Sequence, residues 1–201
     1  MNFLGLDPSF TRTGYSIIDT EKKIVWIRRA STNIDDKGYN SIWRASWTLT
    51  QEIVGSLDEL GIILDSVIME VPVAGQVFSG GLFMLGTHII DTLSNKYQGM
   101  DYYTLYPNFV SNRLHGKRSY NKAESTVLAF KWIKELQNMG YEIISQKSSK
   151  NIPIKIVHDE AESFLFLVKL MSLKGLIPEE LIKVNPNFHT RKDDMMKMTL
   201  Y

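Results

Sequence analysis

Four acidic residues stand where a carboxylate needs an explanation. Asp7 ends the apolar run NFLGL, and Glu70 ends the apolar run SVIM. Asp159 and Glu162 open a helical stretch and, being three residues apart, share one helix face, whereas Glu160 faces elsewhere. Carboxylate oxygens are the ligands that Mg²⁺ prefers, and Mn²⁺ accepts the same set. If the four acids converge, they would hold two such ions, which activate water for phosphodiester hydrolysis.

Each of these acids has a simpler explanation when it is considered singly. Asp7 precedes Pro8 and is a typical turn-initiating residue. Glu70 would be equally well explained by a salt bridge, because an unpaired buried charge is costly. Asp159 and Glu162 are favoured near a helix N-terminus by the helix dipole. Only together do the four acids favour a divalent metal site, since without cations they would repel one another strongly.

The sequence predicts alternating strands and helices that position these acids. We expect strands at residues 2–7, 14–19, 24–27, 66–71 and 102–106, and a short one at 154–157. Helices are expected at 41–60, 81–96, 122–139 and 159–174, where apolar residues recur every three or four positions. Gly175 is a C-terminal cap for the last helix. This order predicts an α/β fold in a single domain, residues 1–175, in which helices cover both faces of a mixed sheet. A C-terminal extension of unassigned role follows, residues 176–201.

Composition narrows the class of protein. A chain of 201 residues with 44% hydrophobic and 22% charged residues is typical of one soluble domain. It has neither a signal peptide nor an apolar run near the roughly 20 residues of a membrane span, so we expect no membrane partner and a cytoplasmic location, that of the host cell if a phage encodes it. The absence of cysteine excludes disulfides, thiolate nucleophiles and cysteine-based zinc sites. A net charge of +1 decides nothing about DNA binding, because acids at a metal site would offset basic residues elsewhere.

A basic stretch without acids, SNRLHGKRSYNK, spans residues 111–122. We expect its basic residues to contact DNA phosphates, although a solvated loop is the simpler alternative. They are Arg113, Lys117, Arg118 and Lys122. Tyr120 is compatible with base stacking or with an ordinary surface position. A second acid-free stretch carries Lys147, Lys150 and Lys155, and DNA contact and simple solvation are equally compatible with it.

None of three histidines is expected to be catalytic. His88 lies on an apolar helix and is predicted to be a packed core residue. His115 belongs to the basic stretch. His158 directly precedes Asp159, and we expect it at the helix start or behind the metal ligands.

In LGLDPSFTRTGYSIID an Asp is followed by a short turn and Thr-Gly, and VIMEVP contains a second acid at a strand end. These segments resemble the opening and the second acidic strand of the RuvC family of Holliday-junction resolvases, and phage-type members most closely. YPNFVSNRLHGKRSYNKAES resembles its Pro-led helix, Gly loop and Lys-started helix. HDEAESFLF resembles its terminal helix, with Glu162 where Asp is more common. These segments occur in the family's order over roughly residues 2–172.

The resemblance implies an RNase H-like fold and a Mg²⁺-dependent endonuclease that resolves junctions by paired symmetric nicks, leaving 5′-phosphate and 3′-hydroxyl ends. It implies Lys122 as an active-site lysine near the scissile phosphate. The implied metal ligands are Asp7, Glu70, Asp159 and Glu162. A four-way junction approximates two-fold symmetry, so we expect a homodimer, with the helix after Gly81 as its interface.

One departure and three alternatives remain. Val73 stands where the bacterial enzyme has a Phe that probes the junction centre, and Phe78 is the nearest aromatic residue, so this role stays open. A nuclease of the same fold that cuts flaps or forks is an alternative substrate class. Actin-like sugar or acetate kinases share the Asp, turn and Thr-Gly, but need a second domain and phosphate motif that this chain has no room for. A non-catalytic DNA-binding scaffold has no need to keep four acids together.

Overall fold

The computed structural model describes residues 1–33, 39–70, 79–105, 122–146, 154–177 and 195–198. The elements in this part of the chain follow in sequence order. They are β1 (Asn2–Asp7), β2 (Arg12–Asp19), β3 (Ile24–Ser31), α1 (Tyr39–Glu59), β4 (Ser66–Glu70), α2 (Ser79–Lys96), β5 (Asp101–Leu105), α3 (Lys122–Asn138), β6 (Glu142–Ser145), α4 (His158–Leu173) and β7 (Met195–Met198).

These strands form one mixed sheet in the order β6-β3-β2-β1-β4-β5-β7. The chain begins with an antiparallel meander of β1, β2 and β3. Strands β4 and β5 then add beside β1 in parallel, and β6 adds in parallel to β3 at the other edge. Strand β7 closes the β5 edge in antiparallel orientation, so part of the C-terminal extension belongs to the sheet.

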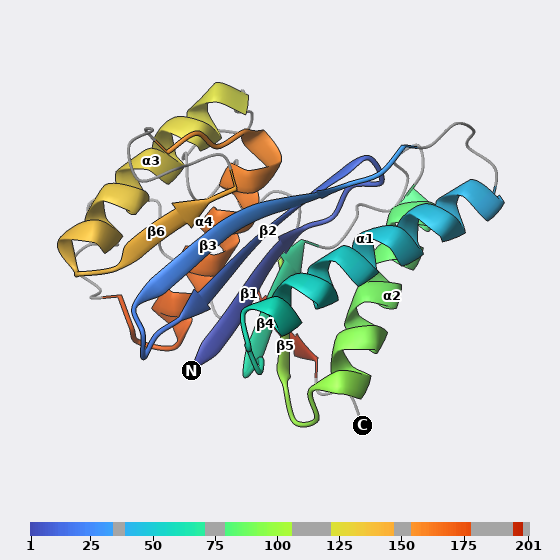
Figure 1. The fold of residues 1–201 in the computed structure, drawn as a ribbon, viewed down its shortest axis with the longest axis horizontal. Coiled ribbons are helices and arrows are strands. Elements are labelled where there is room, and N and C mark those ends of the chain that lie inside the picture. Colours follow the sequence, from blue (N-terminus) through green and yellow to red (C-terminus); the bar gives the residue numbers. More distant parts are fainter. Residues whose placement is uncertain (34–38, 71–78, 106–121, 147–153, 178–194, 199–201) are drawn as a thin grey trace.

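Helices cover both faces of this sheet, with α1 and α2 on one side and α3 and α4 on the other (Figure 1). Two separate cores result, because successive side chains of a strand point to opposite faces. Phe3 packs in the core with α3 and α4, and its neighbour Leu4 packs in the core with α1 and α2. The predicted α/β fold is therefore confirmed. No described helix is both long enough and apolar enough to cross a membrane.

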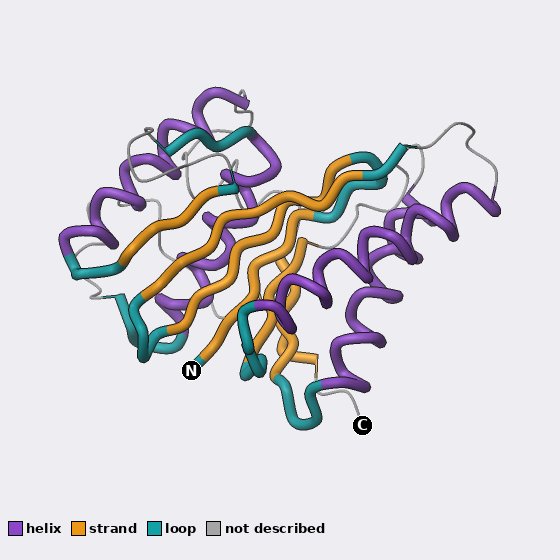
Figure 2. Tube along the Cα trace, viewed as in Figure 1, coloured by secondary structure: helices purple, strands orange, loops and turns teal. Residues whose placement is uncertain are grey.

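The structure corrects two predicted strands. Residues 154–157 are not a strand but lead into α4. The backbone N–H of Val157 donates a hydrogen bond to the Glu160 carboxylate at 2.7 Å, and this bond stabilises the start of the helix. The strand in this region is β6, which was not predicted because four residues, EIIS, give too little alternation to recognise. Strand β3 also runs to Ser31 rather than ending at Ile27, and Figure 2 draws it as one long strand beside β2.

A second correction concerns aromatic residues on α1. The four-residue spacing of Trp43 and Trp47 predicts that they widen the apolar face of this helix, but they are 45% and 53% exposed. His88 of α2 was expected in the core, yet it is half-buried and lies between them, with its ring centroid 5.2 Å from Trp43 and 5.7 Å from Trp47. The buried face of α1 is made by the smaller residues that recur every three or four positions, as the periodicity predicts: Ala45, Leu49, Ile53 and Leu57. The three rings, Trp43, Trp47 and His88, are hereafter the aromatic cluster.

Candidate active site

Asp7 and Glu70 end two neighbouring parallel strands at the same level of the sheet. Leu6 of β1 pairs with Met69 of β4, so the next position in the register places Asp7 beside Glu70. Both acids lie on the sheet face that α4 covers. Phe3 and Ile68 belong to the core with α4, and each lies an even number of residues before the acid on its strand, so it shares the acid's face. Asp7 and Glu70 thus lie at predicted strand ends, on the same face of the sheet and at the same end of two neighbouring strands.

Helix α4 lies against this face because two glycines let its backbone approach. A Cβ atom at Gly14 would overlap the carbonyl group of Asp159, and one at Gly5 would overlap the carbonyl oxygen of Ser163. The Ser163 hydroxyl also forms a 3.0 Å hydrogen bond with the hydroxyl of Ser16 on β2. Since Gly14 pairs with Asp7, this contact brings the first turn of α4 next to the strand that ends in Asp7.

Glu162 lies close enough to Glu70 to change its ionisation. Burial raises the pKa of the Glu70 carboxyl from its ordinary value of 4.5 to about 8, and the negative charge of Glu162 contributes to this rise. Glu162 itself is only 5% exposed. A strand and a helix that are far apart in sequence therefore bring two carboxyl groups together in a poorly solvated place.

The neighbours of Glu162 on α4 have separate tasks. His158 Nε2 lies 3.2 Å from Glu162 Oε2, one helical turn away, which agrees with the expected place of His158 at the helix start and behind an acid. Glu160, by contrast, accepts the hydrogen bond from the Val157 backbone N–H and stabilises the start of the helix. The prediction that Glu160 faces away from the pair of Asp159 and Glu162 agrees with this contact.

The donor set suits a hard divalent cation. A carboxyl group whose pKa is raised by burial and by a neighbouring carboxylate gains from a cation between the two, and oxygen ligands select Mg²⁺ or Mn²⁺. Within the described ranges, no group of three or more His, Asp or Glu side chains is already arranged as a metal site. The structure thus brings Glu70 and Glu162 together and places Asp7 and Asp159 at the same end of the same face; that all four are metal ligands stays a prediction.

Most of the predicted DNA contacts lie outside the described residues. Lys122 is the first residue of α3, but nothing is described of its side chain. The other basic residues of the first stretch lie outside the described residues: Arg113, Lys117 and Arg118. The same holds for His115 and Tyr120 of this stretch, and for Val73 and Phe78. Of the second basic stretch, Lys155 is described and exposed.

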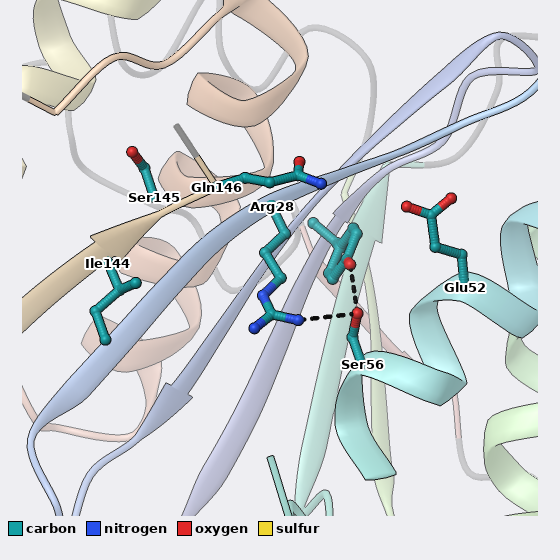
Figure 3. Close-up of a pocket in the computed structure, with 7 residues that line it drawn as sticks. Arg28, Glu52, Ser56, Ile144, Ser145 and Gln146 are labelled. Atoms are coloured by element: carbon teal, nitrogen blue, oxygen red, sulfur yellow. Dashed lines mark hydrogen bonds between the residues drawn. The ribbon is translucent and has the colours of Figure 1, made fainter. Parts of the chain in front are cut away.

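A hollow lies on the opposite face of the sheet, between α1 and strands β2, β3 and β6 (Figure 3). Its centre is a hydrogen-bonded trio in which the Ser56 hydroxyl lies 2.7 Å from the Tyr15 hydroxyl and accepts from Arg28 at 3.2 Å. Tyr15 belongs to the core with α1 and α2, so the sheet separates this hollow from the acids. It is not the candidate active site.

The fold is similar to that of known resolvases. Thermus thermophilus RuvC in complex with Holliday junction substrate is 13% identical, with a TM-score of 0.51 over 88% of this chain and 97% of that chain. The yeast mitochondrial Holliday junction resolvase Ydc2 is also 13% identical, with a TM-score of 0.51 over 87% of this chain and 79% of the other. No family model and no curated protein matches the sequence. The chain has the RNase H-like α/β fold of the RuvC Holliday junction resolvases, as its sequence predicted.

Proposed function

We propose that this protein is a Mg²⁺-dependent DNA endonuclease that cuts four-way junctions by paired symmetric nicks. The observation that carries the proposal is the pair formed by Glu70 and Glu162. Two carboxyl groups in a poorly solvated place destabilise the fold unless a cation or a proton joins them, and burial already holds the Glu70 pKa at about 8. A carboxyl group whose pKa is shifted this far by burial and by a charged neighbour marks a candidate functional site.

The acids of the proposed site would be the metal ligands: Asp7, Glu70, Asp159 and Glu162. When bound there, Mg²⁺ would supply an activated water and stabilise the leaving oxygen of a phosphodiester. His158 would hold the Glu162 carboxylate in place through its 3.2 Å contact. Lys122 would stabilise charge at the phosphate under attack, and Arg113, Lys117 and Arg118 would contact the DNA backbone.

A branched substrate and a homodimer belong to the same proposal. The likeness in fold to RuvC, whose structure contains a Holliday junction substrate, supports the choice of substrate. Two symmetric nicks need two active sites related by a two-fold axis, and a second copy of this chain supplies the other site. The half-exposed tryptophans of the aromatic cluster, on α1 beside His88 of α2, are apolar surface that a second copy would cover.

The test compares nicking of four DNA substrates by the purified protein: a four-way junction, a flap, a fork and a linear duplex. Each is incubated with Mg²⁺, with Mn²⁺ and with excess chelator. We expect symmetric cuts in the junction with either metal and none with chelator. Glu70→Gln should be inactive, while Glu142→Gln, at an exposed position of β6, should cut like the wild type.

Each other outcome of this test has a definite meaning. Undiminished cutting in chelator would contradict the metal mechanism. Preferential cutting of the flap or the fork would keep the nuclease but replace the substrate. Binding of the junction without cutting in either metal would favour the non-catalytic scaffold.

A further inference from the structure

Two arginines share the sheet face of the acids and were not predicted as site residues. In the register of the sheet, Arg29 of β3 pairs with Gly14 of β2, which in turn pairs with Asp7 of β1. With Glu70 on β4, one row crosses four adjacent strands and has acids at one end and Arg29 at the other. Arg12 lies two residues before Gly14 on β2, and is therefore a diagonal neighbour of Arg29.

Strand alternation places both side chains on the α4 face. Val25 and Ile27, four and two residues before Arg29, belong to the core with α3 and α4. Arg12 shares its face with Ser16, whose hydroxyl contacts Ser163 of α4. Side chains two residues apart in a strand point the same way, so both arginines lie on the face that carries Asp7 and Glu70.

Neither guanidinium has an acidic partner within the described part of the chain. Among the residues that the structure describes, Arg12 and Arg29 form no ion pair; Arg12 is exposed, and the buried Nε of Arg29 has no hydrogen-bond partner. Arg28 is the opposite case. It points to the other face, where it donates to Ser56 and to Glu59 at 3.2 Å each (Figure 3 shows the bond to Ser56). The two arginines on the acid face thus keep donors available for a ligand.

The position of the pair selects the ligand. Neighbouring strands lie about 4.8 Å apart, so Arg29 is roughly 10 Å from Asp7 across the sheet. A phosphate held for cutting at the acids would have the next phosphates of its strand within that span. Guanidinium groups bind phosphate oxygens in a bidentate manner, and they would also offset the repulsion between the acids and DNA.

We propose that Arg12 and Arg29 bind phosphates of the DNA strand beside the scissile one, on the β2–β3 side of the active site. This inference rests on the proposed nuclease function and assigns a DNA contact separate from the basic stretch at residues 111–122. It predicts that a bound strand runs across the sheet from the acids towards β3.

The experiment measures the affinity for a fluorescein-labelled junction and for a linear duplex, in excess chelator, over a series of salt concentrations. The variants are Arg12→Gln, Arg29→Gln and Arg29→Lys, with Arg44→Gln as the control. Arg44 is an equally charged, exposed residue of α1, on the far side of the sheet. Thermal melting of each variant is recorded alongside.

We expect each Gln variant to weaken binding to both DNAs and to lower the slope of log K against log salt by about 0.9, the value for one lost phosphate contact in duplex DNA. Arg29→Lys should keep the slope because it keeps the charge, and should fold even if Arg29→Gln does not. Arg44→Gln should match the wild type. Equal slopes in the wild type, Arg12→Gln and Arg29→Gln would overturn the inference.

This result is distinguishable from a failure of the proposed function. If the wild type cuts the junction with Mg²⁺ while the slopes of the Gln variants are unchanged, only the arginine contact is wrong. If the slopes of the Gln variants fall but the wild type cuts no DNA, the arginine contact with DNA is supported and the proposed nuclease activity is wrong.

Discussion

Gly14 of β2 and Asp159 of α4 are in direct backbone contact, and a Cβ atom at Gly14 would overlap the Asp159 carbonyl group. Gly14 also pairs with Asp7 in the sheet. One glycine therefore sets how closely the helix that carries two of the proposed ligands approaches the strand that carries a third. This contact gives a physical reason for the Thr-Gly that follows the Asp in the sequence.

Gly14→Ala should move the start of α4 away from β1 and β2. We expect a loss of about 1–3 kcal/mol of unfolding free energy, since the added atom meets backbone rather than a flexible side chain. The cleavage rate should fall on the order of 100-fold, because small misplacements of reacting groups are costly. Chemical denaturation and single-turnover cleavage measure the two effects.

Gly55→Ala is the matched control for this substitution. Gly55 lies within α1, and its added Cβ would meet no atom within 4 Å. The change should stabilise the protein by about 0.5–1 kcal/mol, because alanine is the better helix former. Wild-type cleavage by Gly14→Ala would mean that the approach of α4 does not control the site.

Much of this arrangement was predictable from local pattern, and the remainder depends on partners distant in sequence. The apolar runs that end in Asp7 and Glu70 predicted both strand ends, and the three-residue spacing separated Glu162 from Glu160. The pattern did not predict β6, since four residues on an edge strand show almost no periodicity. It also ended β3 at Ile27, and so left Arg29 outside any element, because two consecutive arginines interrupt the apolar alternation.

The aromatic residues of α1 show a different limit. Helical spacing predicted correctly which residues of α1 face the core, but it also predicted that Trp43 and Trp47 widen this apolar face, and they are half-exposed. The sheet already receives smaller side chains from α1, so the tryptophans are left half-exposed beside His88. Periodicity defines the direction of a side chain, whereas the space available beneath the helix is a tertiary property.

The stability of the metal-free protein should fall as the pH rises from about 4.5 to about 8. The pKa of the Glu70 carboxyl is about 8 in the folded state and 4.5 as an ordinary side chain. Within this window the folded state keeps a proton that the unfolded state has lost, so raising the pH favours unfolding. Glu70→Gln should remove this part of the pH dependence, which thermal melting in chelator at several pH values would reveal.

Added Mg²⁺ should reverse the trend. Its binding requires the deprotonated carboxylate, so the rise in melting temperature on adding Mg²⁺ should be larger at pH 8 than at pH 6. Identical pH profiles for the wild type and Glu70→Gln would show that Glu70 does not titrate in this range. An equal Mg²⁺ effect at both pH values would argue against Glu70 as a ligand.

Trp47→Glu should weaken the proposed dimer. Trp47 is 53% exposed in the aromatic cluster, and a charge there would remain unpaired when a second copy covers it. Analytical ultracentrifugation should show more monomer, and cleavage should give single nicks in place of paired ones. Ile63→Glu is the control, at a position 72% exposed in the loop before β4. A dimer that forms equally well in both variants would place the interface elsewhere.

Substitutions at Glu162 and Glu160 should distinguish a role in catalysis from a role in stabilising the helix α4. Glu162 lies near Glu70 and His158, whereas Glu160 accepts the hydrogen bond of the Val157 backbone N–H at 2.7 Å. Glu162→Gln removes a ligand charge. Metal catalysis supplies several kcal/mol of transition-state stabilisation, and each 1.36 kcal/mol is tenfold in rate, so we expect a loss on the order of 100-fold or more.

Glu160→Gln should cut normally, because an amide oxygen can accept the same backbone hydrogen bond. Glu160→Ala should lose about 1 kcal/mol of unfolding free energy through the missing bond and still cut once folded. Single-turnover rates and denaturation curves for the three variants measure both effects. If Glu160→Gln is inactive while Glu162→Gln cuts at the wild-type rate, α4 supplies its second ligand from Glu160, and the proposed role of Glu162 is wrong.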